Sequence, residues 1–459
     1  MIKPSRKRKQ LVLASADFLI LCLCLPLTLI LRNKEYPTYF SLKIHFMHFI
    51  PIMFFWIIAM YAANFYVLEK RFDKLRAIFS LTVIASVSLL FGFTLFYLFF
   101  SDTITPKRIL VIYIIADFIF IFFWRYFYNF IYFKFKNLPK IVFVGYNRTL
   151  KNLIAEMKKL SYFNYEIVAV FDESLKNKEK PEIWNFTVLN EVQDFADFIN
   201  NNTVDIIVFE MEKNFNSAVR KKLLSLLNRN ILFYSLPDFY EIAIRRIPLG
   251  SLNDVWILSE IDLSSKQMFF LYKRISDIII AFAILIVTAI PLIISAIAIK
   301  FESKGPIFFK QIREGKNGKL FSILKFRTMK MVGNDFAPTK QNDPRITRVG
   351  SFLRKTRIDE FPQMINVLAG DMSIIGPRPE RPELAIELEN NIPFYRQRLL
   401  VKPGITGWDQ ISGEYHSPSV SDTIKKLEYD LYYIKNVSVL LDVSIFFKTI
   451  TTMFSKAGI

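Results

Sequence analysis

The sequence predicts a membrane protein in three parts: four transmembrane helices, a cytoplasmic Rossmann-like α/β domain, and an α/β monotopic catalytic domain with a re-entrant membrane helix. Three observations predict it. Four long apolar segments open the chain, strand and helix patterns alternate through its middle, and a basic, motif-dense segment follows a fifth apolar run. The expected parts are residues 1–136, 137–262 and 263–459.

The four apolar segments lie at about 11–31, 46–68, 77–100 and 109–133. Each approaches the ~20 residues that span a bilayer as a helix. The first is too long for a signal peptide, and three more follow it. Basic residues gather before the first segment, in the second loop and beyond residue 134. Because cytoplasmic loops carry the excess of Lys and Arg, we expect these regions, and all later domains, on the cytoplasmic side.

Composition limits the classes of molecule that the protein is expected to bind. The chain is 52% hydrophobic and carries a net charge of +19. The basic residues flank apolar segments or lie in loops typical of phosphate sites, so we expect anionic lipid and phosphorylated substrates, and no nucleic acid. The two cysteines, Cys22 and Cys24, share an apolar run, which excludes a disulfide framework or a zinc site.

The middle part predicts a doubly wound sheet. Strand patterns at 140–145, 167–172 and 204–210 alternate with helical ones. Gly145 begins a turn that lacks the further glycines of a dinucleotide-binding loop. This favours a degenerate nucleotide-binding domain with a packing or regulatory role over a working cofactor site.

The fifth apolar run, about 278–299, contains Pro291 and has basic residues on both sides. Lys273 and Arg274 precede it, and Lys300 and Lys304 follow it. A proline inside a helix favours a break. A re-entrant helix, which enters and leaves on the cytoplasmic face, keeps both basic clusters there. The alternative is a fifth true span.

Two groups of charged residues beyond residue 300 suggest phosphate chemistry. Lys325 and Arg327 alternate along a strand pattern, so we expect them on one face, either around a phosphate or simply in solvent. Asp359 and Glu360 are adjacent carboxylates. One carboxylate can bind Mg²⁺ while the other attacks phosphorus, or both can belong to an ordinary first helical turn; charge alone does not decide. We expect Arg357 to keep Asp359 ionised.

Rigid loops present further cations. Arg378 stands between Pro377 and Pro379, which restrict the backbone and suit bidentate phosphate binding. Lys402-Pro-Gly-Ile-Thr-Gly407 is a second rigid basic loop, and Tyr429-Asp-Leu-Tyr-Tyr433 is rich in tyrosine, as at a membrane interface.

These motifs, in this order, resemble those of the bacterial sugar transferases, the polyprenyl-phosphate sugar-1-phosphate transferases also called monotopic phosphoglycosyl transferases. The resemblance covers about 268–459 and includes Lys273-Arg274-Ile-Ser-Asp277, Pro306 to Arg313, Lys325-Phe-Arg-Thr-Met329, Asp359-Glu360 and Gly376-Pro-Arg-Pro379. The spans and middle domain are similar in arrangement to the long members, which include undecaprenyl-phosphate glucose and galactose phosphotransferases.

The resemblance implies a reaction and a site. Asp359 is then the nucleophile on the β-phosphate of a UDP-sugar, UDP-glucose or UDP-galactose, with release of UMP, and Glu360 binds Mg²⁺. Undecaprenyl phosphate accepts the sugar phosphate as the first membrane step of exopolysaccharide, capsule or O-antigen synthesis, at the bacterial inner membrane. A homo-oligomer is possible, and the sequence does not decide the oligomeric state. The implied substrate-binding residues are Lys273, Arg274, Arg313, Lys325, Arg327, Arg357, Arg378 and Asp430, with Asp430 supporting or ordering the site.

Two departures from the family pattern stand out. Ile290 precedes Pro291 where some small members have Ser, so the helix break depends on the proline alone. Glu414 stands where many members have Arg, which bears on the choice of sugar or nucleotide.

Two other functions are the alternatives to this one. A nucleotide-sugar dehydratase needs a glycine-rich loop and a Tyr-x-x-x-Lys pair, and 140–262 has neither. A non-catalytic membrane scaffold or regulator of polysaccharide export is expected to have lost a charge from the Asp359–Glu360 pair, which is intact.

Overall fold

The computed structural model describes residues 4–63, 65–66, 74–99, 107–134, 138–159, 165–173, 186–210, 217–229, 231–330, 343–412 and 419–454. The chain forms two compact units, Met1–Ser251 and Leu252–Ile459. Each is considered by itself. Glu414 lies outside the described residues.

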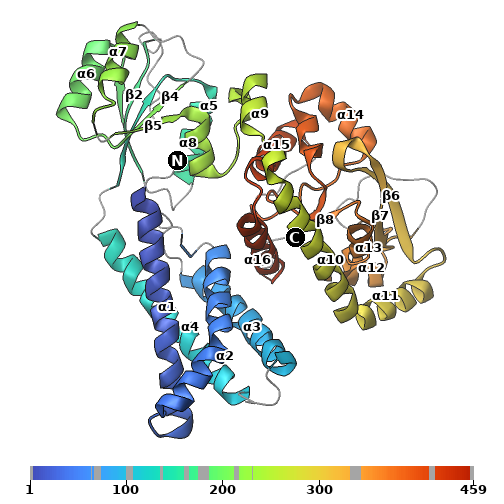
Figure 1. Ribbon diagram of the computed structural model, residues 1–459. Helices are drawn as coiled ribbons and strands as arrows, with labels where there is room; N and C mark the ends of the chain where they lie inside the picture. Colours follow the sequence, from blue (N-terminus) through green and yellow to red (C-terminus); the bar gives the residue numbers. More distant parts are fainter. Residues whose placement is uncertain are drawn as a thin grey trace. The chain divides into compact units, whose positions relative to one another are not determined.

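The first unit begins with four apolar helices, as predicted: α1 (Pro4–Asn33), α2 (Tyr39–Ala62), α3 (Lys74–Phe99) and α4 (Lys107–Lys134). In the described part of the chain these four are long and apolar enough to cross a membrane, and a bent helix pair in the second unit brings the number to five if it counts as one span. α1 packs against α2 and α4, and α3 packs against the same two helices (Figure 1). A buried ion pair, Asp17 with Arg125, joins α1 to α4.

The second helix starts earlier than predicted. The apolar pattern indicated 46–68, whereas α2 runs from Tyr39 to Ala62. Thr38 explains the start, because its side chain accepts a hydrogen bond from the backbone N–H of Ser41 and caps the helix. Hydropathy counts apolar residues and does not detect such a cap.

The sheet of the first unit is parallel, with the order β3-β2-β1-β4-β5. Helices cover both faces: α5 (Arg148–Lys159) and α8 (Leu236–Ile244) pack on one, and α6 (Val192–Asn201) and α7 (Ser217–Ser225) on the other. The alternation of the predicted strands is therefore confirmed. The strands are β1 (Lys140–Val144), β2 (Glu166–Phe171), β3 (Thr187–Leu189), β4 (Ile206–Phe209) and β5 (Leu232–Ser235).

The second unit packs helices around short sheets. β6 (Phe308–Glu314) and β7 (Leu320–Phe326) form an antiparallel hairpin, and β8 (Ser373–Ile375) pairs in parallel with β9 (Gly404–Thr406). Its main core includes Ala281, Val367, Met372 and Ile434. The helices are α9 (Asp254–Glu260), α10 (Gln267–Val287), α11 (Ala289–Glu302), α12 (Arg348–Thr356), α13 (Gln363–Ala369), α14 (Pro382–Asn391), α15 (Val420–Lys435) and α16 (Val439–Phe454).

The fifth apolar run is bent. α10 and α11 meet at 63°, and the break falls at Thr288, three residues before Pro291 (Figure 1). Pro291 therefore lies in the first turn of α11, where its missing N–H needs no helical partner. The proline is compatible with starting the second helix and does not interrupt the first.

Candidate active site

The two adjacent carboxylates lie on a tight turn between two helices. α12 ends where Arg357 adopts a left-handed conformation, with φ of 56°. A short 3-10 turn, Ile358–Glu360, follows, and α13 begins at Gln363. The pair thus belongs to a 3-10 turn that precedes α13 and not to the first turn of that α-helix.

Glu360 is held ionised by cations. Its Oε1 accepts a hydrogen bond from Lys325 Nζ at 2.7 Å and lies 3.5 Å from Arg378 Nη2. Burial alone raises the pKa of a carboxyl, but Lys325, Arg378 and Arg357 outweigh burial and lower the pKa of Glu360 to about 2. Glu360 is therefore a carboxylate throughout the physiological range.

Asp359 lies in a different environment. Burial and the neighbouring Glu360 charge raise its pKa, and Lys325 and Arg354 only partly oppose them. We expected Arg357 to keep Asp359 ionised. Instead Arg357 lowers the pKa of Glu360, and the pKa of Asp359 is raised overall. Two neighbouring carboxyls with separated pKa values are suited to different roles.

Asn366 connects the helix that follows the carboxylates to the strand that carries Lys325. From α13, its side chain accepts a hydrogen bond from Leu324 N at 3.0 Å and donates one to Ser322 O at 2.8 Å. Both partners are on β7, the strand that carries Lys325. A buried amide, 8% exposed, therefore fastens the helix after Glu360 to the strand that supplies its main cation.

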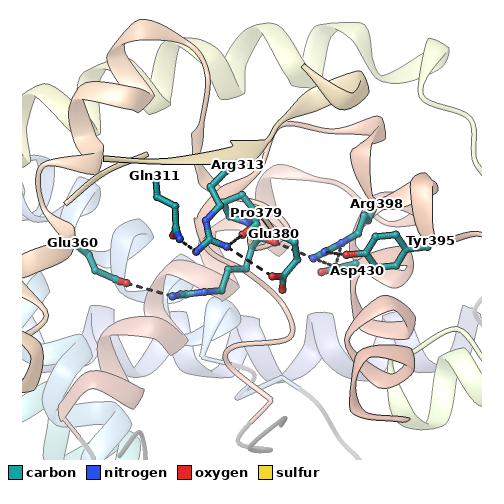
Figure 2. A network of polar contacts seen from close by, with 9 residues as sticks. Gln311, Arg313, Glu360, Pro379, Glu380, Tyr395, Arg398 and Asp430 are labelled. Carbon is teal, nitrogen blue, oxygen red and sulfur yellow. Dashed lines mark hydrogen bonds and ion pairs between the residues drawn. The ribbon is translucent and has the colours of Figure 1, made fainter. Parts of the chain in front are cut away.

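The loop from Gly376 to Pro379 carries Arg378, and two arginines, Arg313 and the buried Arg398, contact its backbone (Figure 2). Arg313 Nη1 donates to Pro379 O at 3.1 Å, and Arg398 Nη2 donates to Arg378 O at 2.9 Å. Arg398 also donates to Asp430 Oδ2 at 2.9 and 3.1 Å. Burial raises the pKa of Asp430 to about 7, against the opposing effect of Arg398.

Close backbone contact explains the glycines of the two rigid loops. A Cβ on Gly376 would lie 2.4 Å from Lys402 O, and one on Gly404 would lie 2.1 Å from Gly376 N. The two loops therefore touch through their main chains, which only glycine permits. This contact holds the Arg378 loop against the loop that begins at Lys402.

The remaining predicted residues are spread more widely. Lys273 pairs with Asp442 at 2.6 Å, and Arg274 donates to the carbonyls of Val367 and Leu368 at the end of α13. Arg327 does not lie beside Lys325 as expected, because β7 ends at Phe326. Its guanidinium is buried and donates to the carbonyls of Ser303 and Lys304. The structure thus gathers Lys325, Arg357 and Arg378 around the carboxylates.

Sequence reasoning missed three contributors. Arg354 acts on Asp359 electrostatically, Asn366 joins α13 to β7, and Arg398 contacts the Arg378 backbone. Arg354 stands in the same charged segment as Asp359, a signal that was available. The other two are recognisable only from their tertiary contacts.

The acidic pair fits Mg²⁺ if substrate supplies most of the ligands. Among the residues that the structure describes, no group of three or more acidic, His or Cys side chains is placed to hold a metal. Mg²⁺ commonly takes one or two carboxylates together with phosphate oxygens and water. Both cations contact Oε1 of Glu360, which leaves Oε2 for such a role.

The sheet edge of the first unit is occupied by its own acidic side chains. Asp172 accepts a hydrogen bond from Tyr146 N at 2.5 Å, and Glu210 accepts one from the Asn147 side chain. Asn147 also caps α5 through Leu150 N at 2.8 Å. In a Rossmann domain this first loop binds a pyrophosphate. Here two carboxylates accept hydrogen bonds from the loop, and whether the domain binds a cofactor stays a prediction.

The four apolar helices indicate a membrane protein, and its candidate active site is a pair of carboxylates, Asp359 and Glu360, surrounded by basic side chains. Comparison with known proteins identifies the family. Residues 268–456 match the bacterial sugar transferase family, and 62–237 match a CoA-binding domain family. The chain is 31% identical to the UDP-glucose:undecaprenyl-phosphate glucose-1-phosphate transferase of Klebsiella pneumoniae, over 68% of this chain and 67% of that protein. It belongs to the bacterial sugar transferase family.

Two further relatives are similar over smaller shares. The Escherichia coli K12 protein of the same name is 34% identical over 65% of this chain and 64% of its own length. A UDP-N-acetylgalactosamine-undecaprenyl-phosphate N-acetylgalactosaminephosphotransferase of Aeromonas hydrophila is 42% identical over 50% of this chain and 54% of its own. The chain thus spans about two thirds of the first two relatives and about half of the third.

Proposed function

We propose that this protein transfers a sugar 1-phosphate from a UDP-sugar to undecaprenyl phosphate and releases UMP. One observation carries the proposal: Asp359 and Glu360 share a turn, and among the described residues Lys325 and Arg378 form ion pairs with Glu360 and not with Asp359. Asp359 has no hydrogen bond to another side chain among the described residues, so its carboxylate is free to react. The names of the relatives provide the two substrates.

The reaction then proceeds in two displacements. A carboxylate oxygen of Asp359 attacks the β-phosphorus, the bond from that phosphorus to the bridging oxygen breaks, and UMP leaves with the electron pair. The sugar phosphate remains as an acyl phosphate on Asp359. An oxygen of undecaprenyl phosphate next attacks the same phosphorus, which breaks the bond to Asp359 and restores its carboxylate.

The surrounding charges suit these steps. A carboxylate approaching a diphosphate meets strong repulsion, which fixed cations reduce. In this proposal Lys325, Arg357 and Arg378 contact phosphate oxygens, which is supported by their charge beside Glu360 and by the 48% exposure of Arg378. Mg²⁺ held by Glu360 and the diphosphate would neutralise charge on the departing UMP. The raised pKa of Asp359 means that the nucleophile ionises at a higher pH than an ordinary aspartate.

The proposal includes a location. We infer that α10 and α11 form a re-entrant helix that enters and leaves a bacterial inner membrane on its cytoplasmic face, where UDP-sugars are found. Basic residues lie on both sides of the bend, and the apolar residues near it are exposed: Val287 at 79% and Ile290 at 71%.

Cysteine accessibility tests the location. Cys22 and Cys24 are replaced by Ala, and single cysteines are placed at Ser265 and Lys304. In sealed, right-side-out vesicles, a membrane-impermeant maleimide should label neither cysteine until the vesicles are opened. Labelling of only one of them in sealed vesicles would establish a fifth span.

The activity is tested with the full chain in detergent, Mg²⁺, undecaprenyl phosphate and a panel of UDP-sugars that begins with UDP-glucose and UDP-galactose and includes UDP-N-acetylgalactosamine. We expect UMP from at least one donor. Release of UDP would identify a glycosyltransferase and refute the proposal. No nucleotide release from folded protein would favour the scaffold function.

A further inference from the structure

Arg398 is a buried cation that the proposed reaction does not use directly. It lies on the 3-10 helix Tyr395–Leu400 and is 6% exposed. Its donors are distributed over three partners: Asp430 on α15, the Tyr395 hydroxyl at 2.9 Å, and the Arg378 carbonyl at 2.9 Å. Only the last of these belongs to the candidate active site.

Figure 2 shows a network that extends from Glu360 to Asp430, and the contact between Arg398 and the Arg378 main chain joins its two ends. Arg398 holds the main chain of Arg378, and the side chain of Arg378 reaches Glu360 at 3.5 Å. Pro377 and Pro379 on either side restrict the backbone further. The position of the Arg378 guanidinium therefore depends on where Arg398 places the loop.

Stability alone is a weak reason for this arrangement. Removing two charges from water is costly, and well-packed apolar side chains often replace a buried ion pair without loss of stability. A buried pair that also donates to a loop carbonyl fixes that loop in one place, since a guanidinium has a rigid, planar set of donors.

We propose that Arg398, held by Asp430 and Tyr395, is a positioning residue that fixes the Arg378 loop so that Arg378 stands beside Glu360 and the diphosphate. This inference rests on the proposed transferase function for its kinetic test. In this role Arg398 acts through Arg378 and not on the diphosphate directly.

A double-mutant cycle tests the kinetic part. Arg398→Lys keeps the charge, but one ammonium cannot reach all three partners. Loss of a hydrogen bond to a charged group predicts a fall of about 10- to 100-fold in kcat/KM for the UDP-sugar. In an Arg378→Ala background the same change should have little further effect, because the residue that it positions is gone. Effects that multiply would overturn the proposal.

Matched variants separate positioning from folding. Arg396→Lys alters an exposed arginine on the same 3-10 helix, paired with Glu389, and should leave kcat/KM unchanged. Tyr395→Phe removes one contact of Arg398 and keeps its ion pair, so it remains usable if Arg398→Lys does not fold. We expect a smaller fall that also disappears in the Arg378→Ala background. An equal fall in both backgrounds would indicate a merely structural role.

Hydrogen exchange measured by mass spectrometry does not depend on activity. Amides in the segment 376–380 should exchange faster in Arg398→Lys, or in Tyr395→Phe, than in the wild type or Arg396→Lys. Unchanged exchange there would overturn the positioning role. If the wild type releases no UMP, the proposed function fails, whereas the exchange result still decides whether Arg398 holds the loop.

Discussion

Replacing Lys325 by Met should change the acid limit of activity. Lys325 is the main cation of Glu360 and also acts on Asp359. Lowering the pKa of Glu360 from its ordinary 4.5 to about 2 corresponds to about 3 kcal/mol in favour of its ionised form. When Lys325 is removed, fewer positive charges counter the effect of burial, so the pKa values of Asp359 and Glu360 both rise. Because the nucleophile must be ionised, activity should disappear at a higher pH than in the wild type.

The assay is the rate of UMP release from pH 4 to 8, taken as kcat/KM, with melting temperature measured alongside. Lys325 is one of three cations that lower the pKa of Glu360, so its loss removes only part of these about 3 kcal/mol. Each 1 kcal/mol lost from a unit of this size lowers the melting temperature by about 2 to 4 °C. Lys319→Met, an exposed lysine beside the same strand, is the matched control. An acid limb that superimposes on the wild type, with only the plateau reduced, would refute the electrostatic reasoning.

Three other changes test the site. Glu360→Gln should destabilise the protein by about 3 kcal/mol at pH 7 and progressively less below pH 4.5. A carboxyl whose pKa is lowered by folding contributes stability above its pKa in the unfolded chain, and this stability is lost as the pH falls through about 2. Melting curves measured against pH check the sign of the effect. Asn366→Leu leaves two main-chain groups of β7 without partners and should cost about 2 kcal/mol or more, and an unchanged denaturation midpoint would contradict that role. Gly404→Ala places a methyl group 2.1 Å from Gly376 N and should abolish folded, active protein, as judged by size-exclusion chromatography.

Much of the fold could be predicted because it depends on local patterns. Apolar length predicted the four membrane helices, and short apolar runs between helical segments predicted β1, β2 and β4. Boundaries were less accurate where one polar contact decides them, as at Thr38 and α2. The bend in the fifth run was expected from Pro291 yet falls at Thr288, because proline is best tolerated in the first turn of the second helix.

The candidate site was predictable in its residues but not in their pairing. Asp359, Glu360, Lys325 and Arg378 are recognisable because their motifs are local in sequence. Which cation meets which carboxylate depends on how β7, the carboxylate turn and the Arg378 loop pack together. For the same reason Arg327, two residues from Lys325, was expected beside it and instead binds carbonyls at the end of α11.

The role of Arg398 could not be predicted from the sequence. It stands outside the recognised motifs, two residues after another arginine, and nothing local distinguishes it from Arg396. In the structure Arg396 is exposed at 61% of its side chain, whereas Arg398 is buried against Asp430. The difference arises from the packing of the 3-10 helix on α15, which joins residues 32 positions apart.

Covalent trapping on Asp359 tests the central claim most directly. Full-length protein is incubated with Mg²⁺ and the active UDP-sugar in the absence of undecaprenyl phosphate, quenched, digested and examined by mass spectrometry. We expect one equivalent of UMP and a sugar phosphate on the peptide that contains Asp359. The adduct should be absent from Asp359→Asn and discharged by added undecaprenyl phosphate. UMP that forms only when the lipid is present, with no adduct on any peptide, would contradict a covalent intermediate on Asp359.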